Sequence, residues 1–485
     1  MQRVPIVRIR RIHDYAPRND GQFILYWMTA FRRTRFNFAL QRAIEWTERL
    51  QRPLLVLEAV RSNYRWASER FHQFLIDGMI DNQHAFTKSN ATYYPYVESR
   101  LGEGSGLVEA ISKQACLIVT DDFPCFFYPK LYERIVRKWH CAVELVDSNT
   151  ILPMRATERT FTVAHSYRRF MQKEITNHLT EFPESEPLQY LKTKKLQSIP
   201  EAIQKRWQPC TSLQLASLRL DTLPIDHLVK PTEIRGGPVE AGRVIDRFVK
   251  HRLSNYSEAR NEPELSGSSG LSPYLHFGHL SAHEIFLRIT SAFHWTLENL
   301  GKPNGKIQGY WNVGIDGEAF LDQLLTWREI GFNMCWRESE YDRFESLPAW
   351  AKNTLNEHSK DARQYVYSLA QFENADTHDE LWNAAQRQLV REGRIHNYLR
   401  MLWGKKILQW TASPQDALHI MIELNNKYAL DGRDPNSYSG IFWVLGRYDR
   451  AWGPERPIFG KIRYMTSEST RSKYHVKQYI QQYAE

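Results

Sequence analysis

The chain has 485 residues, of which 42% are hydrophobic and 25% charged, proportions ordinary for a folded protein large enough to bury more than one hydrophobic core. Lysine and arginine (64) outnumber aspartate and glutamate (55), and the net charge of +9 permits a polyanionic partner, although a solvated basic surface would have the same balance. The longest apolar stretches, such as Pro53 to Val60, are too short to cross a bilayer, and the arginine-rich segment Met1–Arg11 lacks the apolar core of a secretory signal.

Short β-type runs alternate with longer helical patterns over residues 1–153. The apolar runs are Phe23–Met28, Leu54–Leu57, Leu117–Val119 and Ala142–Val146. Between them, stretches such as Thr34–Leu50 and Trp66–Ile80 carry apolar residues at helical spacing. This alternation predicts a Rossmann-like α/β domain built on a doubly wound parallel sheet. The glycines of Gly102–Gly106 precede a strand and have the wrong spacing for a dinucleotide-binding loop, so we interpret them as a surface turn.

The rest of the chain changes pattern twice. Residues 154–210 are polar and interrupted by prolines, as in Phe182–Pro187, which predicts an interdomain linker with some helix. Almost every segment of residues 211–485 follows a helical pattern, broken at glycine- and proline-rich turns. We therefore expect an α/β domain over 1–153, a linker over 154–210 and an all-α domain over 211–485.

A loop rich in glycine and serine, Ser266–Ser272, leads into a predicted helix. Ser272 before Pro273 is the expected order of an N-cap and a first helical residue. Backbone N–H groups, hydroxyls and the positive end of a helix dipole could bind a phosphate here, although most such loops are plain connections.

Three histidines follow this loop, and two of them have the spacing of a zinc pair. His279 and His283 are one helical turn apart, and His276 precedes them. No second cluster supplies the remaining ligands at a familiar spacing, so we expect no metal site and interpret the histidines as part of a helix start.

The segment Asp431–Asn436 is charge-dense and lies between the helical runs Asp416–Tyr428 and Tyr438–Leu445. Aspartate, glycine, proline and asparagine together are typical of a capped turn. The alternative interpretation is a carboxylate cluster around the polar ring of a cofactor.

The chain holds 15 tryptophans, more than core filling usually requires. Trp382, Trp403 and Trp410 fall in helical stretches, and the last two are seven residues apart, so they share a helix face about 10 Å apart along the axis. The pattern alone favours a core role for all three.

Taken together and in this order, these segments resemble the photolyase/cryptochrome family, most closely its class II cyclobutane pyrimidine dimer photolyases. The most specific runs are Ser272–Gly278, Trp350–His358, Thr377–Ala384, Arg400–Trp410, Tyr428–Asn436 and Gly460–Met465. The resemblance covers nearly the whole chain. It implies an N-terminal antenna domain and a C-terminal helical domain that holds FAD.

The resemblance also implies a set of cofactor residues. They are Tyr256, Ser268, Ser269, Gly270, Leu271, Ser272, Arg400, Asn425, Asp431 and Asp434. Tyr256 and the loop 268–272 match the segment that holds the FAD phosphates, in agreement with the phosphate-binding interpretation of that loop. Arg400 and Asp431 match an ion pair beside the flavin ring, and Asn425 matches the residue that faces flavin N5.

The catalytic residues implied in the same way are Asn425 and a chain of three tryptophans. Trp403, Trp382 and Trp410 match, from the flavin outward, the chain that carries electrons to it. This implication reverses the preference for a core role. Excited FADH⁻ would give an electron to the dimer and recover it after the ring splits.

A lesion pocket is implied as well. Trp443 matches an aromatic platform for the flipped dimer, Met401 lines the same pocket, Trp327 is a second pocket tryptophan, and Arg463 fills the gap left in the duplex. The family usually carries a glutamate about four residues before Trp327. Asp322 and Gln323 occupy that neighbourhood here, and glutamine supplies neither a negative charge nor a proton.

These matches predict light-driven repair of cyclobutane pyrimidine dimers in double- and single-stranded DNA. The alternatives are a cryptochrome-like blue-light photoreceptor, which the presence of Trp443, Met401 and Arg463 argues against, and repair of six-four photoproducts, which would need active-site histidines that we cannot place. A cofactor-free helical nucleic-acid-binding scaffold is a further alternative from another class.

The expected cofactors and surroundings complete the hypothesis. Besides FAD, an antenna chromophore of the deazaflavin or folate type fits the architecture. Five widely spread cysteines without a Cys-x-x-Cys pair favour a reducing compartment, in the cytoplasm or, in a eukaryote, the nucleus or an organelle. We expect a monomer that binds damaged DNA and no membrane.

Overall fold

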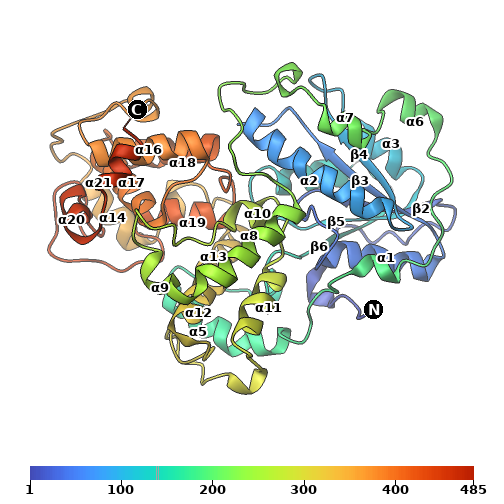
Figure 1. Cartoon of the computed structure of the whole chain (residues 1–485), viewed down its shortest axis with the longest axis horizontal. Helices are drawn as coiled ribbons and strands as arrows, with labels where there is room; N and C mark the ends of the chain where they lie inside the picture. The colour runs from blue at the N-terminus through green and yellow to red at the C-terminus, as the bar shows by residue number, and fades with distance from the viewer. Residues whose placement is uncertain (138, 140, 485) are drawn as a thin grey trace. The chain divides into compact units, whose positions relative to one another are not determined.

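The structure is a computed structural model and describes residues 1–137, 139 and 141–484. The chain forms two compact units, each assembled from three segments (Figure 1). The first consists of Met1–Thr157, Ile175–Asp246 and Leu271–Arg288, and the second of Glu158–Glu174, Arg247–Gly270 and Ile289–Glu485. Within the described residues, none of the helices combines the length and the apolar character needed to span a membrane.

The first unit is built on a six-stranded sheet with the order β1-β6-β5-β2-β3-β4. Its strands are β1 Ile9–Arg11, β2 Phe23–Met28, β3 Leu54–Val60, β4 Thr92–Val97, β5 Ala115–Asp121 and β6 Ala142–Val146. All neighbouring strands are parallel except β1, which is antiparallel to β6. Every residue of β2, β5 and β6 is buried, as expected for inner parallel strands covered on both faces.

The four predicted runs all fall in strands, and the two strands that sequence reasoning missed lie at the sheet edges. β1 has only three residues, two of them arginine, so it has no apolar run. β4 contains Pro95, which cannot donate a ladder hydrogen bond and therefore suits an edge strand. The predicted parallel sheet thus carries one antiparallel edge strand.

Four helices follow strands of this sheet, and the first of them begins at a capping residue. They are α1 Phe38–Leu50, α2 Glu69–Thr87, α3 Leu107–Ser112 and α4 Tyr128–Val136. The side chain of Asn37 accepts hydrogen bonds from the backbone N–H groups of Ala39 (3.0 Å) and Leu40 (3.1 Å) and so caps α1.

The segment that we predicted as a linker is largely part of the first unit. It contains the short helices η2 Met154–Ala156, η3 Ile175–His178, η4 Pro187–Tyr190 and α6 Glu201–Arg206, and α7 Ser212–Ala216 and η5 Leu220–Thr222 follow it. Ile199, Ile203 and Trp207 are buried in the same hydrophobic cluster as Tyr94, whose hydroxyl donates to the carbonyl of Trp207. The compact units therefore do not follow the linear division at 153 and 210, because this segment buries apolar side chains against the sheet.

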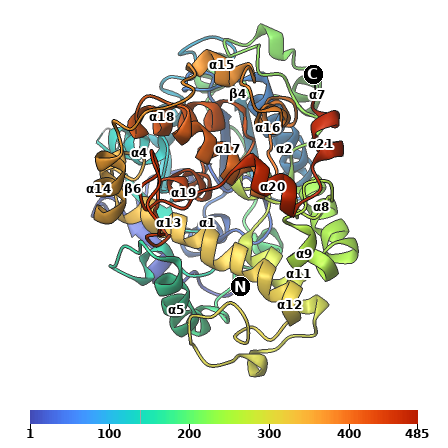
Figure 2. The same ribbon diagram turned by 90° about the vertical axis from the view of Figure 1, so that its left-hand side faces the viewer.

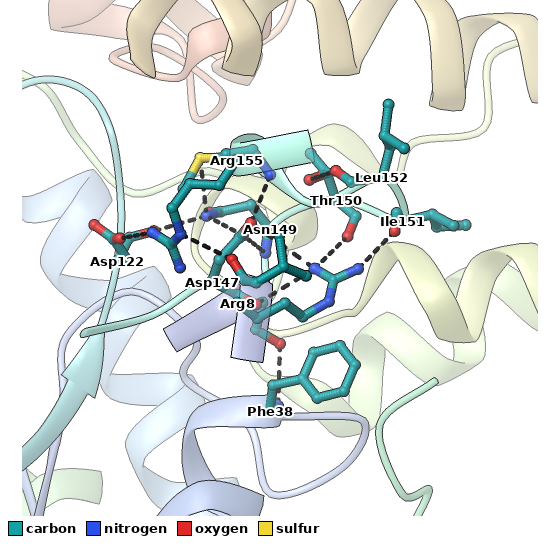
Figure 3. Close-up of polar contacts among 12 residues, drawn as sticks. Arg8, Phe38, Asp122, Asp147, Asn149, Thr150, Ile151, Leu152 and Arg155 are labelled. Carbon is teal, nitrogen blue, oxygen red and sulfur yellow. Dashed lines mark hydrogen bonds and ion pairs between the residues drawn. The ribbon is translucent and has the colours of Figure 1, made fainter. Parts of the chain in front are cut away.

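A buried arginine fixes the chain where it leaves β6 (Figure 3). Arg8 is 1% exposed and donates to the carbonyls of Thr150 (3.0 Å) and Ile151 (2.6 Å). Its guanidinium lies 4.6 Å from the ring centroid of Phe38 on α1. Asp147 accepts from the backbone N–H of Met154 at 2.8 Å. This network holds the residues after β6 in one conformation and satisfies backbone carbonyls that would otherwise be buried without partners.

The second unit is helical. Its longer helices are α5 Ala164–Glu174, α12 Gly314–Leu321, α13 Arg328–Arg337, α14 Ala349–Glu357, α16 Glu380–Glu392, α17 Asn397–Gln409, α18 Pro414–Tyr428 and α19 Pro435–Val444. Shorter ones are η6 Leu253–Asn255, α9 Tyr256–Ala259, η7 Leu297–Asn299, η8 Asp322–Trp327, η9 Phe344–Ser346, α15 Leu369–Glu373, α20 Ser467–Lys473 and α21 Lys477–Gln482. Two helices, α8 Pro238–His251 and α11 Ala282–Ala292, contain two of the five points where the chain passes from one unit to the other.

Helix α17 is the centre of the C-terminal helices and packs against α16, α18 and α19 (Figure 2). Gly404 makes the approach to α19 possible, because a Cβ there would lie 2.5 Å from Cγ2 of Val444. The side chains of Asp379, Ser413 and Asp434 cap α16, α18 and α19. The functional residues predicted near the C-terminus thus lie on packed helices, three of which begin at side-chain caps.

Candidate functional site

Three buried tryptophans form a continuous path on α16 and α17. Trp382 lies between the other two: its ring centroid is 6.5 Å from that of Trp403, with the planes parallel, and 6.1 Å from that of Trp410. Trp382 is 0% exposed, Trp403 3% and Trp410 2%. The indole N–H of Trp382 donates to the carbonyl of Trp403 (3.0 Å), and that of Trp403 donates to Gln386 (2.9 Å). Their spatial order is the one that the resemblance implies.

Arg400, on the same helix one residue before Met401, forms an ion pair. Its Nη2 lies 3.1 Å from Oδ1 of Asp431. Its Nε is buried and has no hydrogen-bond partner among the described residues. A buried N–H without a partner is costly, so this position fits a polar group that the chain itself does not provide.

Asn425, near the C-terminal end of α18, is 3% exposed and held by its neighbours. Its amide nitrogen donates to Oγ of Ser437 (2.7 Å) and to Oδ1 of Asn426 (3.2 Å). Asn426 in turn donates to the hydroxyl of Tyr438 (3.1 Å). Residues of α18 and α19 therefore fix the orientation of the Asn425 amide.

Asp434 has a structural task in addition to the predicted cofactor contact. Its Oδ1 accepts from the backbone N–H of Asn436 at 2.9 Å and caps α19, whose first residue is Pro435. The segment around it is thus the capped turn that its composition indicates. Asp431, three residues earlier, pairs with Arg400.

Tyr256 is a buried aromatic residue at the start of α9. Its ring contacts those of Phe248 and Phe320, at centroid distances of 5.6 and 5.3 Å, and burial raises the pKa of its phenol. His396, the residue before α17, is half-buried, and burial lowers its pKa to about 4.

The predicted phosphate loop requires one correction. Helix α10 covers Ser272–His276, begins one residue earlier than predicted, and has Leu271 as its N-cap without a side-chain hydrogen bond. Ser268, Ser269 and Gly270 lie in the second unit, whereas Leu271 and Ser272 begin the last segment of the first. The carbonyl of Ser268 accepts from Arg252 at 2.9 Å, and Gly270 has a φ of +73°, a conformation that favours glycine.

The three histidines near this loop have structural roles. His279 is buried, accepts a hydrogen bond at Nδ1 from the backbone N–H of Gly237 (2.9 Å) and stacks on Phe74 at 5.2 Å. His283 lies edge-on to Phe182 at 4.9 Å. Within the described part of the chain, no group of histidine, cysteine, aspartate and glutamate residues has a metal-binding arrangement.

A second aromatic group lies on α19 and the segment after it, and cationic side chains contact its rings. Trp443 is half-buried; Nζ of Lys405 lies 4.8 Å from its ring centroid and the guanidinium carbon of Arg463 lies 5.5 Å from it. Arg463 also lies 4.1 Å from the ring centroid of Trp452 and pairs with Asp449 at 3.0 Å. We call Trp443, Lys405, Arg463, Trp452 and Asp449 the cationic cluster.

Sequence reasoning missed three members of the cationic cluster, Lys405, Trp452 and Asp449. Lys405 is fully buried, and its ammonium donates to the carbonyl of Val444 at 2.6 Å. Burial lowers its pKa to about 7; Asp449 opposes this shift and Arg463 adds to it. The signal that could have found it is helical spacing, because Lys405 is one turn beyond Met401 and faces the same side of α17.

Gln323 and Trp327 lie on the π-helical segment η8 between α12 and α13. These two residues are half-buried, whereas the four other residues of the segment are buried, so they share its accessible face. Asp322 is not available to replace the expected glutamate, because it accepts two hydrogen bonds from the buried Arg168, at 2.6 and 3.1 Å. Of the two residues considered for that place, Gln323 is therefore the more accessible one. π-Helical turns of this kind are frequent at functional sites.

Comparison with known proteins gives a consistent assignment. Searched against models of protein families, the chain matches none. It is 33% identical to a deoxyribodipyrimidine photo-lyase from Methanothermobacter thermautotrophicus over 98% of this chain and 97% of that protein. It is 32% identical to a protein of the same name from Arabidopsis thaliana, covering 94% and 88%. Among solved structures, a class III photolyase from Agrobacterium tumefaciens superposes with a TM-score of 0.68 over 96% of this chain and 86% of that chain, at 16% identity, which supports the fold.

Proposed function

The chain belongs to the photolyase/cryptochrome family, and we propose that it binds FAD and uses light to split cyclobutane pyrimidine dimers in DNA. Its fold, a parallel-dominated sheet followed by a helical region, agrees with that membership. The observation that carries the proposal is the cationic cluster, in which a half-buried indole at Trp443 lies between Lys405 and Arg463. A platform of this kind suits a flipped, negatively charged nucleotide lesion, and light sensing alone does not require it.

The cofactor residues support FAD as the bound group. In our proposal Arg400 and Asp431 contact the flavin ring with Asp434 beside them, Asn425 presents its amide to N5, and Tyr256 holds the phosphates with residues 268–272. The buried Nε of Arg400 provides a donor for a ring acceptor. The short helix α10 weakens the dipole contribution that the sequence suggested for the phosphates, so backbone N–H groups and hydroxyls carry most of that contact.

The protein positions the reaction and the cofactor supplies its chemistry. Reduced FAD, when bound and excited by light, provides the electron that opens the cyclobutane ring. Trp403, Trp382 and Trp410 pass electrons inward through buried rings that contact one another. Trp443 and Met401 hold the extruded dimer, and Trp327 with Gln323 forms another wall of the pocket. Arg463 fills the space left in the duplex, which lowers the cost of extrusion.

Gln323 affects which lesion the protein repairs and how fast it repairs it. Its amide can donate to a pyrimidine carbonyl, but it cannot supply the negative charge or the proton that the expected glutamate would. We propose that Gln323 orients the dimer and that repair here proceeds without a carboxylate at this position. Gln323→Glu should then change the efficiency of repair and leave FAD content unchanged, which quantitative turnover under constant light would measure.

An antenna chromophore completes the proposal, and the sheet offers a place for it. The strand order reverses between β2 and β5, where ligands bind in open α/β sheets. Beyond the ends of β3 and β5, Phe126 contacts Tyr64 and Trp66 at centroid distances of 6.3 and 5.9 Å. These rings suit stacking with a planar deazaflavin or folate, and the absorption spectrum of the purified protein, with extraction of the chromophore, distinguishes the two.

The decisive experiment is illumination of FAD-loaded protein with an oligonucleotide that carries one cyclobutane dimer. We expect restored thymines only in the light, and no repair of a six-four photoproduct in the same sequence. A colourless protein that folds but never binds FAD would contradict the proposal. Stable FAD binding without repair would favour the cryptochrome-like photoreceptor. Gel filtration with light scattering tests the expected monomer.

A further inference from the structure

A closed loop of the chain sets how two members of the cationic cluster, Trp452 and Arg463, lie relative to each other. The backbone N–H of Trp452 donates to the carbonyl of Lys461 at 2.9 Å, and further backbone hydrogen bonds join the residues at its tip. Arg463 follows two residues later, and its guanidinium carbon lies 4.1 Å from the ring centroid of Trp452. We call residues 452–461 the closed loop.

The end of helix α14 holds the closed loop through two side chains. Thr354, in the last turn of α14, accepts at Oγ1 from the backbone N–H of Lys461 at 3.0 Å. Asp361, four residues after α14 ends, accepts at Oδ2 from the backbone N–H of Ile458 at 2.8 Å. One hydrogen bond thus fixes the end of the loop that leads to Arg463, and the other fixes its tip.

Two residues of the closed loop have left-handed backbone conformations. Ile458 has a φ of +71°, which is unfavourable for a β-branched residue. Gly460 has a φ of +52°, and a Cβ there would lie 2.6 Å from Cδ2 of His358, so the loop lies directly against the end of α14. Such conformations persist only where surrounding contacts hold them, and the hydrogen bond from Ile458 to Asp361 is one of these contacts.

His358, the residue after α14, lies between two carboxylates. Its Nδ1 is 2.6 Å from Oδ2 of Asp361, and its Nε2 is 3.7 Å from Oε2 of Glu455 in the closed loop. A neutral imidazole has one N–H and can donate to only one of these groups, whereas the imidazolium has an N–H on each side. Arg363 donates to the carbonyl of Asp361 at 3.0 Å, and Lys461 pairs with Glu455 at 3.0 Å. The protonated form of His358 therefore joins the closed loop to α14.

The carboxylates on either side of His358 remain ionised near neutral pH. The hydrogen bond from the backbone of Ile458 is the main cause that lowers the pKa of Asp361. The hydrogen bond with Lys461 is the main cause that lowers the pKa of Glu455. Histidine ordinarily changes its charge between about pH 5 and 8, so a change of pH in this range acts on the imidazole and leaves both partners charged.

We propose that His358 and Asp361 are positioning residues for the recognition of damaged duplex DNA, because they hold the closed loop in the shape that presents Arg463. The inference rests on the proposed function, in which Arg463 fills the gap left by the extruded dimer. Neither residue has to touch the DNA. Protonation of His358 adds the contact with Glu455, so the affinity for damaged duplex rises as the pH falls from 8 to 6.

Binding titrations of the FAD-loaded full chain in the dark, at constant ionic strength, test the proposal. His358→Asn keeps a donor near Asp361 and has no charge for Glu455. At pH 6 it should bind dimer-containing duplex about 2- to 5-fold more weakly than the wild type, as expected for a partly exposed ion pair, and at pH 8 equally well. Affinity for the same lesion in a single strand should not change. His475→Gln is the matched control, because it removes a histidine that pairs with a carboxylate elsewhere in the helical unit.

Asp361 allows a sharper test, because two substitutions separate its hydrogen bond from its charge. Asp361→Ala removes both and should weaken binding of damaged duplex about 10-fold at either pH. Asp361→Asn keeps a carbonyl oxygen for the N–H of Ile458 and should lose only the strengthening at pH 6. Amide hydrogen exchange without DNA measures the loop directly: the N–H of Ile458 should exchange faster in Asp361→Ala and as in the wild type in Asp361→Asn. FAD content and photoreduction should stay unchanged in both variants.

Failure of this inference is distinguishable from failure of the proposed function. A wild type that binds damaged and undamaged duplex equally at every pH would contradict the proposed function. Selective binding by the wild type, with His358→Asn equal to it at pH 6, would overturn the role of His358. Equal losses of single- and double-stranded binding in Asp361→Ala, or unchanged exchange of the Ile458 amide, would show that Asp361 does not act through the closed loop.

Discussion

Helix α17 contributes Trp403 to one group of tryptophans and Lys405 to another, and the surroundings of the two groups are opposite. Along the path of Trp403, Trp382 and Trp410, the rings are at most 3% exposed; Trp382 stacks on Trp403 and lies edge-on to Trp410. In the cationic cluster, Trp443 is half-buried and lies near two cations. Tryptophan is buried where we propose that electrons move. It is half-buried and lies near cations where we propose that DNA binds.

The difference shows what each environment contributes. When charge passes between buried rings, their surroundings reorient little, because water is excluded. An accessible indole can stack with bases, and the arginine and lysine beside it attract phosphates. The two cations repel each other, and the nearby Asp449 reduces the energetic cost of this repulsion. Mutations in one group should therefore leave the function of the other unchanged.

The largest expected effect is in the dry group. Trp403→Phe should nearly abolish photoreduction of bound FAD, because the oxidisable indole is lost while most of the ring volume remains. The stability cost should stay below about 1.5 kcal/mol. Transient absorption measures the yield of tryptophan radicals, and DNA binding serves as the control that should not change. A wild-type radical yield in this variant would mean that electrons take another route.

The next effect is in the cationic cluster. Trp443→Ala should weaken binding of dimer-containing DNA, single- and double-stranded alike, since stacking contributes about 1–3 kcal/mol per base, or roughly 5- to 150-fold. Titrations at several salt concentrations should give the same salt dependence as the wild type, because phosphate contacts are retained. Wild-type binding and repair in Trp443→Ala would remove the pocket assignment and favour a photoreceptor.

Arg463→Ala should have a narrower effect. We expect a loss of about 1.5–3 kcal/mol, the range of hydrogen bonds to charged groups, for damaged duplex only. A single strand has no gap to fill. Asp449→Asn is the matched variant: it keeps the shape of the Asp449 side chain, releases Arg463 from its ion pair, and should not weaken duplex binding. Equal losses for both substrates in Arg463→Ala would make Arg463 an ordinary phosphate contact.

The last effect is on stability rather than on function, and concerns Lys405 and pH. Burial lowers its pKa to about 7, below that of the unfolded chain, so the unfolded state binds more protons between about pH 7 and 10.5. The free energy of unfolding of the wild type, relative to Lys405→Met, should therefore rise with pH in that window, by up to about 1.4 kcal/mol per pH unit. Urea unfolding at pH 7, 8 and 9 measures the slope. A flat difference would show that Lys405 is not the group that titrates.

The sequence by itself determined much of the architecture. Apolar runs such as Phe23–Met28 fixed the inner strands, since a parallel strand covered on both faces must be continuously apolar. The resemblance to photolyases, carried by runs such as Arg400–Trp410, implied that Trp382 lies between Trp403 and Trp410, as it does in the structure. It also implied the ion pair of Arg400 with Asp431, which the structure contains.

Only the tertiary structure decided the remaining questions, because they depend on contacts between residues far apart in the chain. Asp322 and Gln323 are adjacent in sequence, and only the structure shows that Asp322 is buried in an ion pair with Arg168, 154 residues away, whereas Gln323 is half-buried. In the sequence, Lys405 has the pattern of an ordinary helix lysine. Only the structure shows that α19 places Trp443 and the Val444 carbonyl beside it. The segment of residues 154–210 reads as a linker because its few apolar residues are scattered, and only the sheet shows what Ile199, Ile203 and Trp207 are buried against. The local sequence pattern determines which secondary structure each segment forms. The burial and the charge environment of a site depend on residues from distant parts of the chain, which the local pattern does not contain.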